Sequence, residues 1–529
     1  MDDAARYRAT GKYGEPGYVV PMISEPPGRH AVDEQFLALP MRSLADAALQ
    51  RAADLGATYA AFRFGRVSGH SVRLRDGSLD GINDSEDVGY SIRVVVDGTW
   101  GFAADVVRTP EAAARNAERA VALAKVSRPV NTEPVELAPE PSHGEVTWVS
   151  SYAIDPFTVS DADKVARLEA WSRRLLDRPG VNHVDASLLS IKENTFYADL
   201  AGTVATQQRV RLHPNVTAVA IDAESGVFEA MSTVAPPVGR GFEYLDGDGW
   251  DWDTELEQLP GWLLEKLTAP SVEPGRYDLV IHPTNLWLTI HESIGHATEL
   301  DRALGYEANY AGMSFATPDQ LNTLQYGSPI MNVIGDRTVE HGLSSVAIDD
   351  EGVAGSTFDI IRDGVLVGYQ LDRRIAAAYG FAASNGCAYA DSPGHVPIQR
   401  MANVSLAPDP AGPGLDALVS GVDDGLLVVG DKSWSIDQQR YNFQFTGQRF
   451  FRIRSGAITG QVRDVAYQAT TTDFWGSMVA VGGPETHLLA GAFNCGKAQP
   501  GQVAPVSHGA PAAVFAGVNI LNTQQEGAR

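Results

Sequence analysis

The sequence predicts an α+β protein of two domains, and three observations support this fold class. The chain has 529 residues, 44% of them hydrophobic, and exceeds the size at which one hydrophobic core keeps growing. Helical and hairpin patterns alternate through the first half, as in a domain of mixed sheet and helix. Short strand patterns and Gly-rich turns dominate the second half, which predicts a β-rich domain. We expect an extended N-terminal arm (1–40), an N-terminal α+β domain (41–240), a connector (241–270) and a C-terminal β-rich domain (271–529).

The first 40 residues contain several prolines and glycines without helical or strand periodicity, and this predicts the extended arm. From Ser43 onward the apolar residues follow helical spacing. Ser43 and Asp46 are placed as an N-cap pair, and Gly56 is a typical stop signal. A helix is therefore expected from Ser43.

Alternating apolar residues predict the strands of the first domain. These patterns lie at 60–66, 71–75, 90–96 and 184–220. The strand at 90–96 meets a further apolar segment at 100–103 across Asp97-Gly98, which is a strong hairpin signal.

Two more helices are expected in this domain. Thr109-Pro110 provides an N-cap and a first-turn proline, and the alanine-rich stretch after it runs to Lys125. Ser160 opens the second helix, which Pro179-Gly180 ends.

The segment 239–260 is rich in Gly, Asp and Trp and has no clear periodicity, so we interpret it as the domain boundary or as a loop beside the functional site. Beyond Pro274 the pattern is one of short strands. They are expected at 357–361, 365–369, 443–445, 450–453 and 512–516.

Composition excludes several classes of function. Lys and Arg number 41 against 66 Asp and Glu, which gives a formal charge of -25, and such a charge would repel a nucleic acid. The N-terminal 40 residues lack a basic segment followed by an apolar run, and no apolar run reaches the length of a membrane span. We therefore expect a cytoplasmic protein with no membrane and no nucleic-acid partner.

The two cysteines, Cys387 and Cys495, are each interpreted as a small buried residue or a ligand.

The motif with the clearest chemistry is His291-Glu292-Ser293-Ile294-Gly295-His296, which interrupts a strongly apolar stretch. Histidines five residues apart lie about 140° from each other around a regular α-helix, too far to reach one ion. A π-bulge would bring them together, and Gly295 tolerates that distortion. The motif thus predicts an irregular helix at the site.

Two neutral imidazoles can hold Zn²⁺, and Glu292 can take a proton from a water that the metal acidifies to a pKa of about 7. This is the chemistry of metal-assisted hydrolysis. The alternative is a pair of satisfied core histidines. Glu299 follows His296 by three residues and is interpreted as a ligand, a hydrogen-bonding partner of a ligand or a solvated charge.

Other polar residues have weaker signals. Arg400 and Lys497 are candidates for binding a substrate carboxylate, with exposed surface charges as the alternative. His395 precedes Arg400 and is a candidate for the cleft, and otherwise a satisfied histidine. The acidic run Asp349-Asp350-Glu351-Gly352 could bind a divalent ion but is more typical of a turn.

Seven short segments together carry a resemblance to a known family across residues 43–525. They are Gly89–Val94, Asp97–Ala103, His291–His296, Asp349–Gly352, Asp363–Leu366, Arg400–Asn403 and Asn494–Lys497. In these segments the chain resembles the TldD/PmbA family, and specifically its TldD-like, metal-binding members.

The resemblance implies a zinc site made of His291, His296 and Cys495, with Glu292 as general base. It also implies a peptidase that acts on unstructured or precursor peptides held in an extended form. A PmbA/TldE-like protein is the expected partner in a heterodimer, with a homodimer as the alternative.

Two further functions stay open at this point. One is a metal-dependent enzyme that modifies peptides in the maturation of ribosomal peptides without net hydrolysis. The other is a non-catalytic partner or scaffold with a structural metal site, which four protein ligands usually close, whereas a catalytic site keeps an open position.

Overall fold

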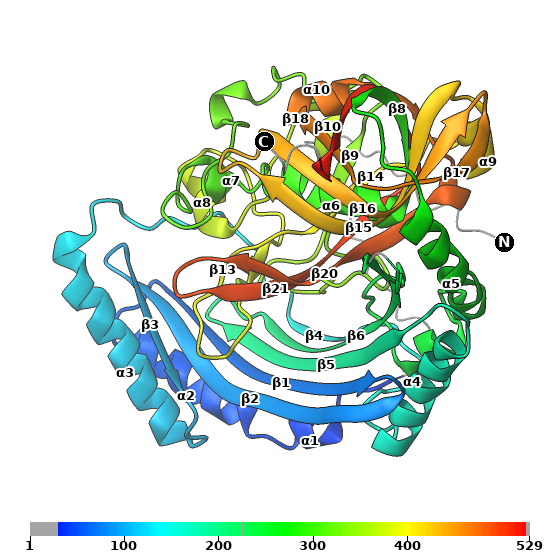
Figure 1. Cartoon of the computed structure of the whole chain (residues 1–529). Helices are drawn as coiled ribbons and strands as arrows, with labels where there is room; N and C mark the ends of the chain where they lie inside the picture. The colour runs from blue at the N-terminus through cyan, green and yellow to red at the C-terminus, as the bar shows by residue number, and fades with distance from the viewer. Residues whose placement is uncertain (1–29, 225, 525–529) are drawn as a thin grey trace.

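The computed structural model describes residues 30–224 and 226–524, and it has the expected α+β architecture (Figure 1). Most of the predicted arm, residues 1–29, lies outside the described residues. The described end of the arm is not extended throughout. It contains the short helix α1 (Glu34–Leu37), which Asp33 caps by accepting a hydrogen bond from the Gln35 amide, and which buries Phe36.

A long sheet forms the N-terminal half, in the order β3-β2-β1-β5-β6-β4 with β7 added to β6. Its strands are β1 (Tyr59–Arg75), β2 (Ser78–Val96), β3 (Thr99–Asp105), β4 (Glu145–Val149), β5 (His183–Asp199), β6 (Val204–Ile221) and β7 (Phe228–Ser232). The predicted hairpin across Asp97-Gly98 is confirmed. The two strands predicted at 60–66 and 71–75 are one continuous strand, β1. In Figure 1 the long strands curve beneath the C-terminal half of the molecule.

The main helices of this half bury alanine- and leucine-rich faces. They are α2 (Met41–Asp54), α3 (Pro110–Ser127), α4 (Asp161–Leu176) and α5 (Trp252–Thr268). The first two share one core with β1 and β2. The last two share a second core with β5 and β6.

The predicted helix starts are confirmed for α3 and α4, where Thr109 and Ser160 accept hydrogen bonds from backbone amides of the first turn. The predicted start at Ser43 is wrong. Helix α2 begins at Met41 after Pro40, and the Ser43 hydroxyl donates to the Pro40 carbonyl at 2.9 Å instead of capping the helix.

The predicted connector (241–270) contains helix α5, which the sequence did not predict. Asp251 caps this helix, and Pro260 lies buried inside it. Leu256, Leu259 and Leu263 face the second N-terminal core. The segment is therefore packed against the long sheet.

Strands dominate the C-terminal half, which has a seven-stranded sheet in the order β15-β8-β22-β18-β16-β17, with β19 on β22. Its strands are β8 (Gly275–Ile281), β15 (Asp424–Ile436), β16 (Asn442–Arg454), β17 (Ala457–Val462), β18 (Val465–Thr470), β19 (Met478–Val481) and β22 (Ala513–Asn522). Because β15 also pairs with β16, five of these strands close into a ring. The strands predicted at 443–445 and 450–453 are both part of β16.

Smaller sheets and short helices complete this half. The strands are β9 (Val333–Asp336), β10 (Thr357–Arg362), β11 (Val365–Leu366), β12 (Ala388–Tyr389), β13 (Ile398–Gln399), β14 (Asn403–Leu406), β20 (Leu488–Lys497) and β21 (Gln502–Ala510). The helices are α6 (Pro283–Ile290), α7 (Leu300–Ala303), α8 (Arg373–Ala378), α9 (Leu415–Ser420) and α10 (Thr471–Gly476). No helix among the described residues is long and apolar enough to cross a membrane.

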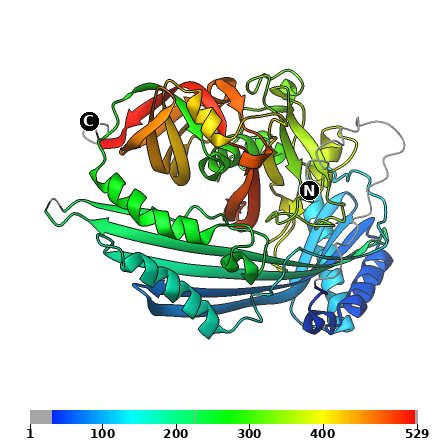
Figure 2. The ribbon, with the colours of Figure 1, turned by 90° about the vertical axis from the view of Figure 1, so that its right-hand side faces the viewer.

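The acidic run 349–352 connects the two halves. Asp350 pairs with Arg63 of β1 at 3.0 Å, and Glu351 pairs with Arg93 of β2 at 2.8 Å. Since both carboxylates have cationic partners on the long sheet, the run is a turn at a junction and not a divalent-ion site. The two halves meet with the β20–β21 hairpin between them (Figure 2).

Candidate metal centre

The His291–His296 motif lies where helix α6 changes its winding. His282 caps α6, accepting a hydrogen bond from the Thr284 amide, and Pro283 occupies the first turn. After Ile290 the chain forms one π-helical turn, His291–Gly295, and the His296 amide donates to the His291 carbonyl at 3.0 Å. The predicted π irregularity is therefore confirmed. A Cβ on Gly295 would lie 2.4 Å from the Met401 sulfur, so close packing also favours glycine there.

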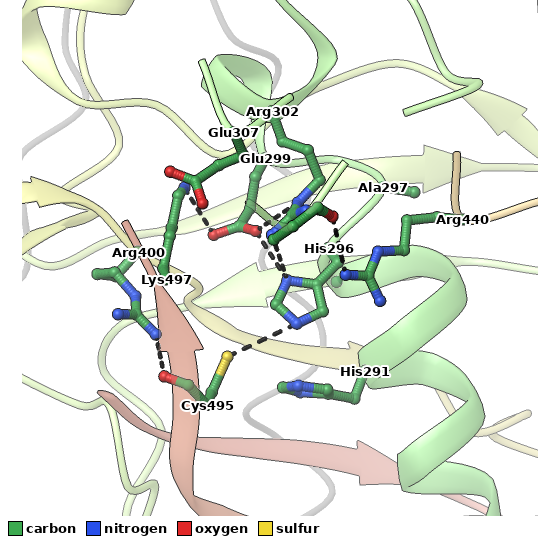
Figure 3. Close-up of polar contacts among 12 residues, drawn as sticks. His291, His296, Ala297, Glu299, Arg302, Glu307, Arg400, Arg440, Cys495 and Lys497 are labelled. Carbon is green, nitrogen blue, oxygen red and sulfur yellow. Dashed lines mark hydrogen bonds and ion pairs between the residues drawn. The ribbon is translucent and has the colours of Figure 1, made fainter. Parts of the chain in front are cut away.

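The π turn brings both imidazoles to the side of the helix that faces Cys495 on β20 (Figure 3). The His291 and His296 rings lie 4.7 Å apart between centroids, and the Cys495 Sγ lies 3.7 Å from the His296 Nε2. All three side chains are buried, and their ligand atoms lie within 4.8 Å of one another. The hairpin thus returns a residue 199 positions away to the turn.

A chain of hydrogen bonds sets the tautomer of His291. The Nδ1 of His508 lies 2.9 Å from the Val404 carbonyl, which can only accept, so this nitrogen carries the proton. The Nε2 of His508 is then an acceptor for the His291 Nδ1, 2.7 Å away. The lone pair of the His291 Nε2 is left for a metal. Sequence reasoning missed His508, because nothing distinguishes it from the other histidines before the strands are assembled.

Glu299 orients the other imidazole. Its carboxylate accepts hydrogen bonds from the His296 Nδ1 at 2.9 Å, from Lys497 at 3.0 Å and from the Arg302 Nε at 3.3 Å. Burial raises the pKa of Glu299, but Lys497 and His296 outweigh that effect and hold it well below the usual value. The interpretation of Glu299 as a solvated charge is wrong. Its carboxylate binds the Nδ1 of His296, while Cys495 approaches the Nε2.

Arg400 and Lys497 are both 1% exposed, so the alternative of surface charges is wrong. The Lys497 ammonium contacts Glu299, Asp301, and the backbone and side-chain oxygens of Gln399, which uses its three donors and leaves none for a substrate carboxylate. Arg400 donates to the backbone carbonyls of Cys495 and Gln502 and so supports the β20–β21 hairpin.

The remaining candidates lie outside the cluster. The His395 Nδ1 contacts the Asp391 carboxylate at 2.6 Å, on a loop that Ser392 fastens to Asp87 of the long sheet. Cys387 is buried, and burial raises its pKa to about 12, so it is an inert thiol.

The protonation states suit a metal. Burial lowers the pKa of His296 to about 4 and also lowers that of His291, so both imidazoles are neutral at pH 7. Burial raises the pKa of Cys495, but His296 and Arg400 outweigh it, and the net pKa lies below the usual value. Two neutral imidazoles and a sulfur that deprotonates readily form a donor set that fits Zn²⁺.

Glu292 has a cationic partner that sequence reasoning missed. The Arg440 Nη1 donates to the Glu292 Oε2 at 2.5 Å, and the Arg440 Nη2 lies 3.3 Å from the Ala311 carbonyl. Arg440 lies in the turn between β15 and β16, where its φ of 62° places it in the left-handed region. Its ion pair fixes the carboxylate that follows the first histidine of the motif.

Comparisons with known proteins match the sequence to a family. The family model described as PmbA/TldA metallopeptidase domain 1 matches residues 60–124, and the one for the PmbA/TldA metallopeptidase C-terminal domain matches residues 274–522. A metalloprotease of Methanothermobacter thermautotrophicus is 27% identical over 454 residues, which is 86% of this chain and 93% of that protein. The zinc metalloprotease TldD homolog of Saccharolobus solfataricus is 24% identical over 431 residues, which is 80% of this chain and 88% of that protein.

A solved structure shares the fold. The crystal structure of TldE from Thermococcus kodakarensis superposes with a TM-score of 0.69 at 15% sequence identity, and covers 90% of this chain and 99% of that one. At this identity the likeness concerns the fold alone.

Proposed function

The chain belongs to the PmbA/TldD family of metallopeptidases, and from this premise we propose that it is a zinc-dependent peptidase acting on unstructured or precursor peptides. The observation that carries the proposal is the convergence of His291, His296 and Cys495 beside Glu292. Three protein ligands leave an open position, as catalytic zinc sites do. Glu299 contacts the Nδ1 of His296, whereas Cys495 approaches the Nε2 of the same ring. Glu299 is therefore not a fourth protein ligand, which argues against a closed structural zinc site.

When bound, zinc supplies the Lewis-acid chemistry that polarises a peptide carbonyl and acidifies water. The side chains of the protein perform the remaining steps. Glu292 takes a proton on its carboxylate from the attacking water and passes it to the leaving amine. Arg440 holds that carboxylate in place, while His508 and Glu299 keep the two imidazoles in the tautomer with a free Nε2.

An extended substrate would suit the surroundings of the cluster. Cys495 lies on β20, and among the described strands the β20–β21 sheet pairs with no other. A peptide added alongside a strand is bound through main-chain hydrogen bonds, which depend little on side-chain identity. This supports binding of peptides with varied sequences.

We also propose a TldE-like protein as the partner, because a TldE structure shares this fold over nearly its whole length. A homodimer is the alternative. A stable interface should bury more than about 1,000 Å². Mass photometry of the chain with and without a co-expressed TldE-like protein tests the pairing, and full peptidase activity from a monomer at nanomolar concentration would contradict it.

The proposed reaction is tested by incubating the zinc-loaded protein, alone and with its partner, with a peptide library, followed by mass spectrometry. Hydrolysis gives two fragments whose masses sum to that of the substrate plus one water. A product of unchanged mass with a rearranged or cyclised backbone would instead identify a peptide-modifying enzyme. Chelation of zinc should abolish the products in either case.

Arg440→Gln is expected to leave the zinc content unchanged and lower kcat by about 10- to 100-fold, because the base loses the ion pair that positions it. Metal analysis and kcat on a peptide substrate measure the two effects. Arg454→Gln, at the exposed far end of strand β16, which follows the turn that contains Arg440, is the control and should behave as the parent protein. Loss of zinc from Arg440→Gln would show that Arg440 supports the metal centre and not the base.

His508→Phe should weaken zinc binding by about 10- to 100-fold, the usual effect of removing the group that orients a ligand. A competition titration with a chelator measures the affinity. His143→Phe removes a histidine paired with Glu140 in the N-terminal half and should have no such effect. Equal affinities in the two variants would contradict the tautomer assigned to His291.

The shifted pKa values also predict how zinc binding depends on pH. The pKa of His296 is near 4, so protons compete little at its Nε2 between pH 8 and 5, and the lowered pKa of His291 reduces proton competition at the other imidazole. Cys495, whose pKa lies below its usual value, is the third group that a proton can occupy in place of zinc. Zinc should therefore bind more weakly as the pH falls, with log Kd rising by no more than about 2 per pH unit between pH 8 and 5. A slope near 3 below pH 6 would show that the imidazoles titrate normally.

A further inference from the structure

A small cavity lies where the long sheet meets the C-terminal half, close to the metal centre. Its volume is about 10 Å³, room for one water molecule or one ion of similar size. Its polar lining consists of Arg209 and Arg211 of β6, Arg337, Ser344, Tyr389 and Arg400. All four guanidinium groups belong to residues at most 5% exposed, so their charges lie in the interior.

The cavity walls carry more positive than negative charge. Glu193 neutralises part of it by pairing with Arg209 at 2.6 Å and with Arg211 at 2.9 Å. Neither Arg337 nor Arg400 has an ion pair among the described residues. A buried cation without a counter-charge is strongly unfavourable.

The carboxylates of Asp349 and Asp350 interact electrostatically with Arg337, but each has partners of its own. Asp350 pairs with Arg63. Asp349 accepts hydrogen bonds from the Glu351, Val353 and Ala388 amides. Neither carboxylate is within hydrogen-bonding distance of Arg337.

Several donors around the cavity lack an acceptor. Within the described part of the chain they are the Arg211 Nη2, the Arg337 Nε, the Arg400 Nε and the Ser344 hydroxyl. No hydrogen bond from any nitrogen of the Arg337 guanidinium is formed with the described residues. A guanidinium can only donate, so these groups call for an acceptor, and the excess of positive charge calls for an anionic one.

We propose that this cavity binds a single small anion, held mainly by Arg337 and by the free donors of Arg211 and Arg400. A compact negative charge can come from a free halide or from the carboxylate of a bound peptide. The second source rests on the proposed function, whereas the first does not.

The position of the cavity couples its occupant to the metal centre. Arg400 contributes to the cavity and donates to the carbonyl of Cys495. Met401 lines the cavity and packs against Gly295 of the π turn. An anion that holds Arg400 in place should therefore also stabilise the β20–β21 hairpin.

Binding of a free halide is tested with bromide on the full-length, zinc-loaded protein. Replacing sodium gluconate by sodium bromide at constant ionic strength should raise the unfolding midpoint by about 2 °C or more, because bromide binds only the folded state. Crystals grown with bromide should show an anomalous peak within the cavity. Arg337→Gln should lose both signals.

Arg449→Gln is the control, since Arg449 is similarly buried, has two nitrogens without a hydrogen-bond acceptor and lies outside the cavity, where it pairs with Glu255 at 3.6 Å. It should keep the bromide-dependent shift, whatever its own stability. Because each variant is compared with itself in two salts, a general loss of stability does not imitate loss of the site. Arg337→Met serves as a second variant should Arg337→Gln not fold.

Binding of a peptide carboxylate is tested with the zinc-loaded Glu292→Gln variant, which should bind peptides without cleaving them. A peptide with a free C-terminal carboxylate should bind at least 10-fold more tightly than its amide, and an added Arg337→Gln change should remove the preference. A bromide signal identifies a free anion, and the peptide preference identifies the carboxylate. If the protein shows neither, or if either persists unchanged in Arg337→Gln, the proposal is wrong. Absence of all peptide binding would count against the proposed function and leave the bromide result standing.

Discussion

Replacing Glu292 by glutamine is expected to leave zinc bound and to lower kcat by about 10²- to 10⁴-fold, the usual contribution of a general base. The amide keeps the shape of the side chain and can still contact Arg440, which donates to the Oε2 at 2.5 Å in the parent protein. It cannot take a proton from water. Metal analysis and kcat on the same preparation measure the two quantities.

His291→Ala is the contrasting variant, because it removes a metal donor and should lose zinc together with activity. Normal turnover by the zinc-loaded Glu292→Gln protein would falsify the assignment of the base. Loss of zinc from that variant would show instead that Glu292 supports the metal site.

Cys495→Ser is expected to weaken zinc binding by more than about 100-fold and to abolish activity, because a hydroxyl is a far poorer zinc donor than a thiolate. The effect should exceed that of His508→Phe, since Cys495 is a proposed ligand and His508 only orients one. Isothermal titration of the metal-free protein with zinc gives the affinity.

Cys387→Ser is the natural control, being the only other cysteine in the chain. Cys387 is also buried, but its sulfur contacts the Asn385 carbonyl and its pKa is raised to about 12. Its loss should leave zinc affinity unchanged. Equal zinc affinities for Cys495→Ser and the parent protein would exclude the three-ligand site.

The parts of the site that follow from local geometry could be predicted. Two histidines five residues apart can face one ion only on a widened turn, and the structure has a π turn at 291–295. Cys495 could not be reached in this way, because 199 residues separate it from His296, and only the family resemblance pointed to it. His508 and Arg440 were missed for the same physical reason. Their roles exist only after distant strands and turns have packed around the helix.

In the fold as well, features with a local cause could be predicted, and features that depend on long-range packing could not. Caps and turns with a local chemical cause, such as Thr109, Ser160 and Asp97-Gly98, were predicted correctly. Helix α5 was missed because Pro260 and Gly261 lie inside it, and both weaken the local helical signal. Burial of its leucines against the long sheet stabilises it despite these residues.

The distance along the chain between His296 and Cys495 also bears on how the protein is made. Coordination across 199 residues would close a large loop, and in a flexible chain such closure costs about 5 kcal/mol of entropy at this length. With the proposed ligand set, the site could not form during translation until the ribosome had released β20, and metal insertion would be one of the last steps of biogenesis. Once loaded, the ion would act as a reversible cross-link between the middle and the end of the chain. Chains truncated before Cys495 should therefore remain metal-free and sensitive to proteolysis.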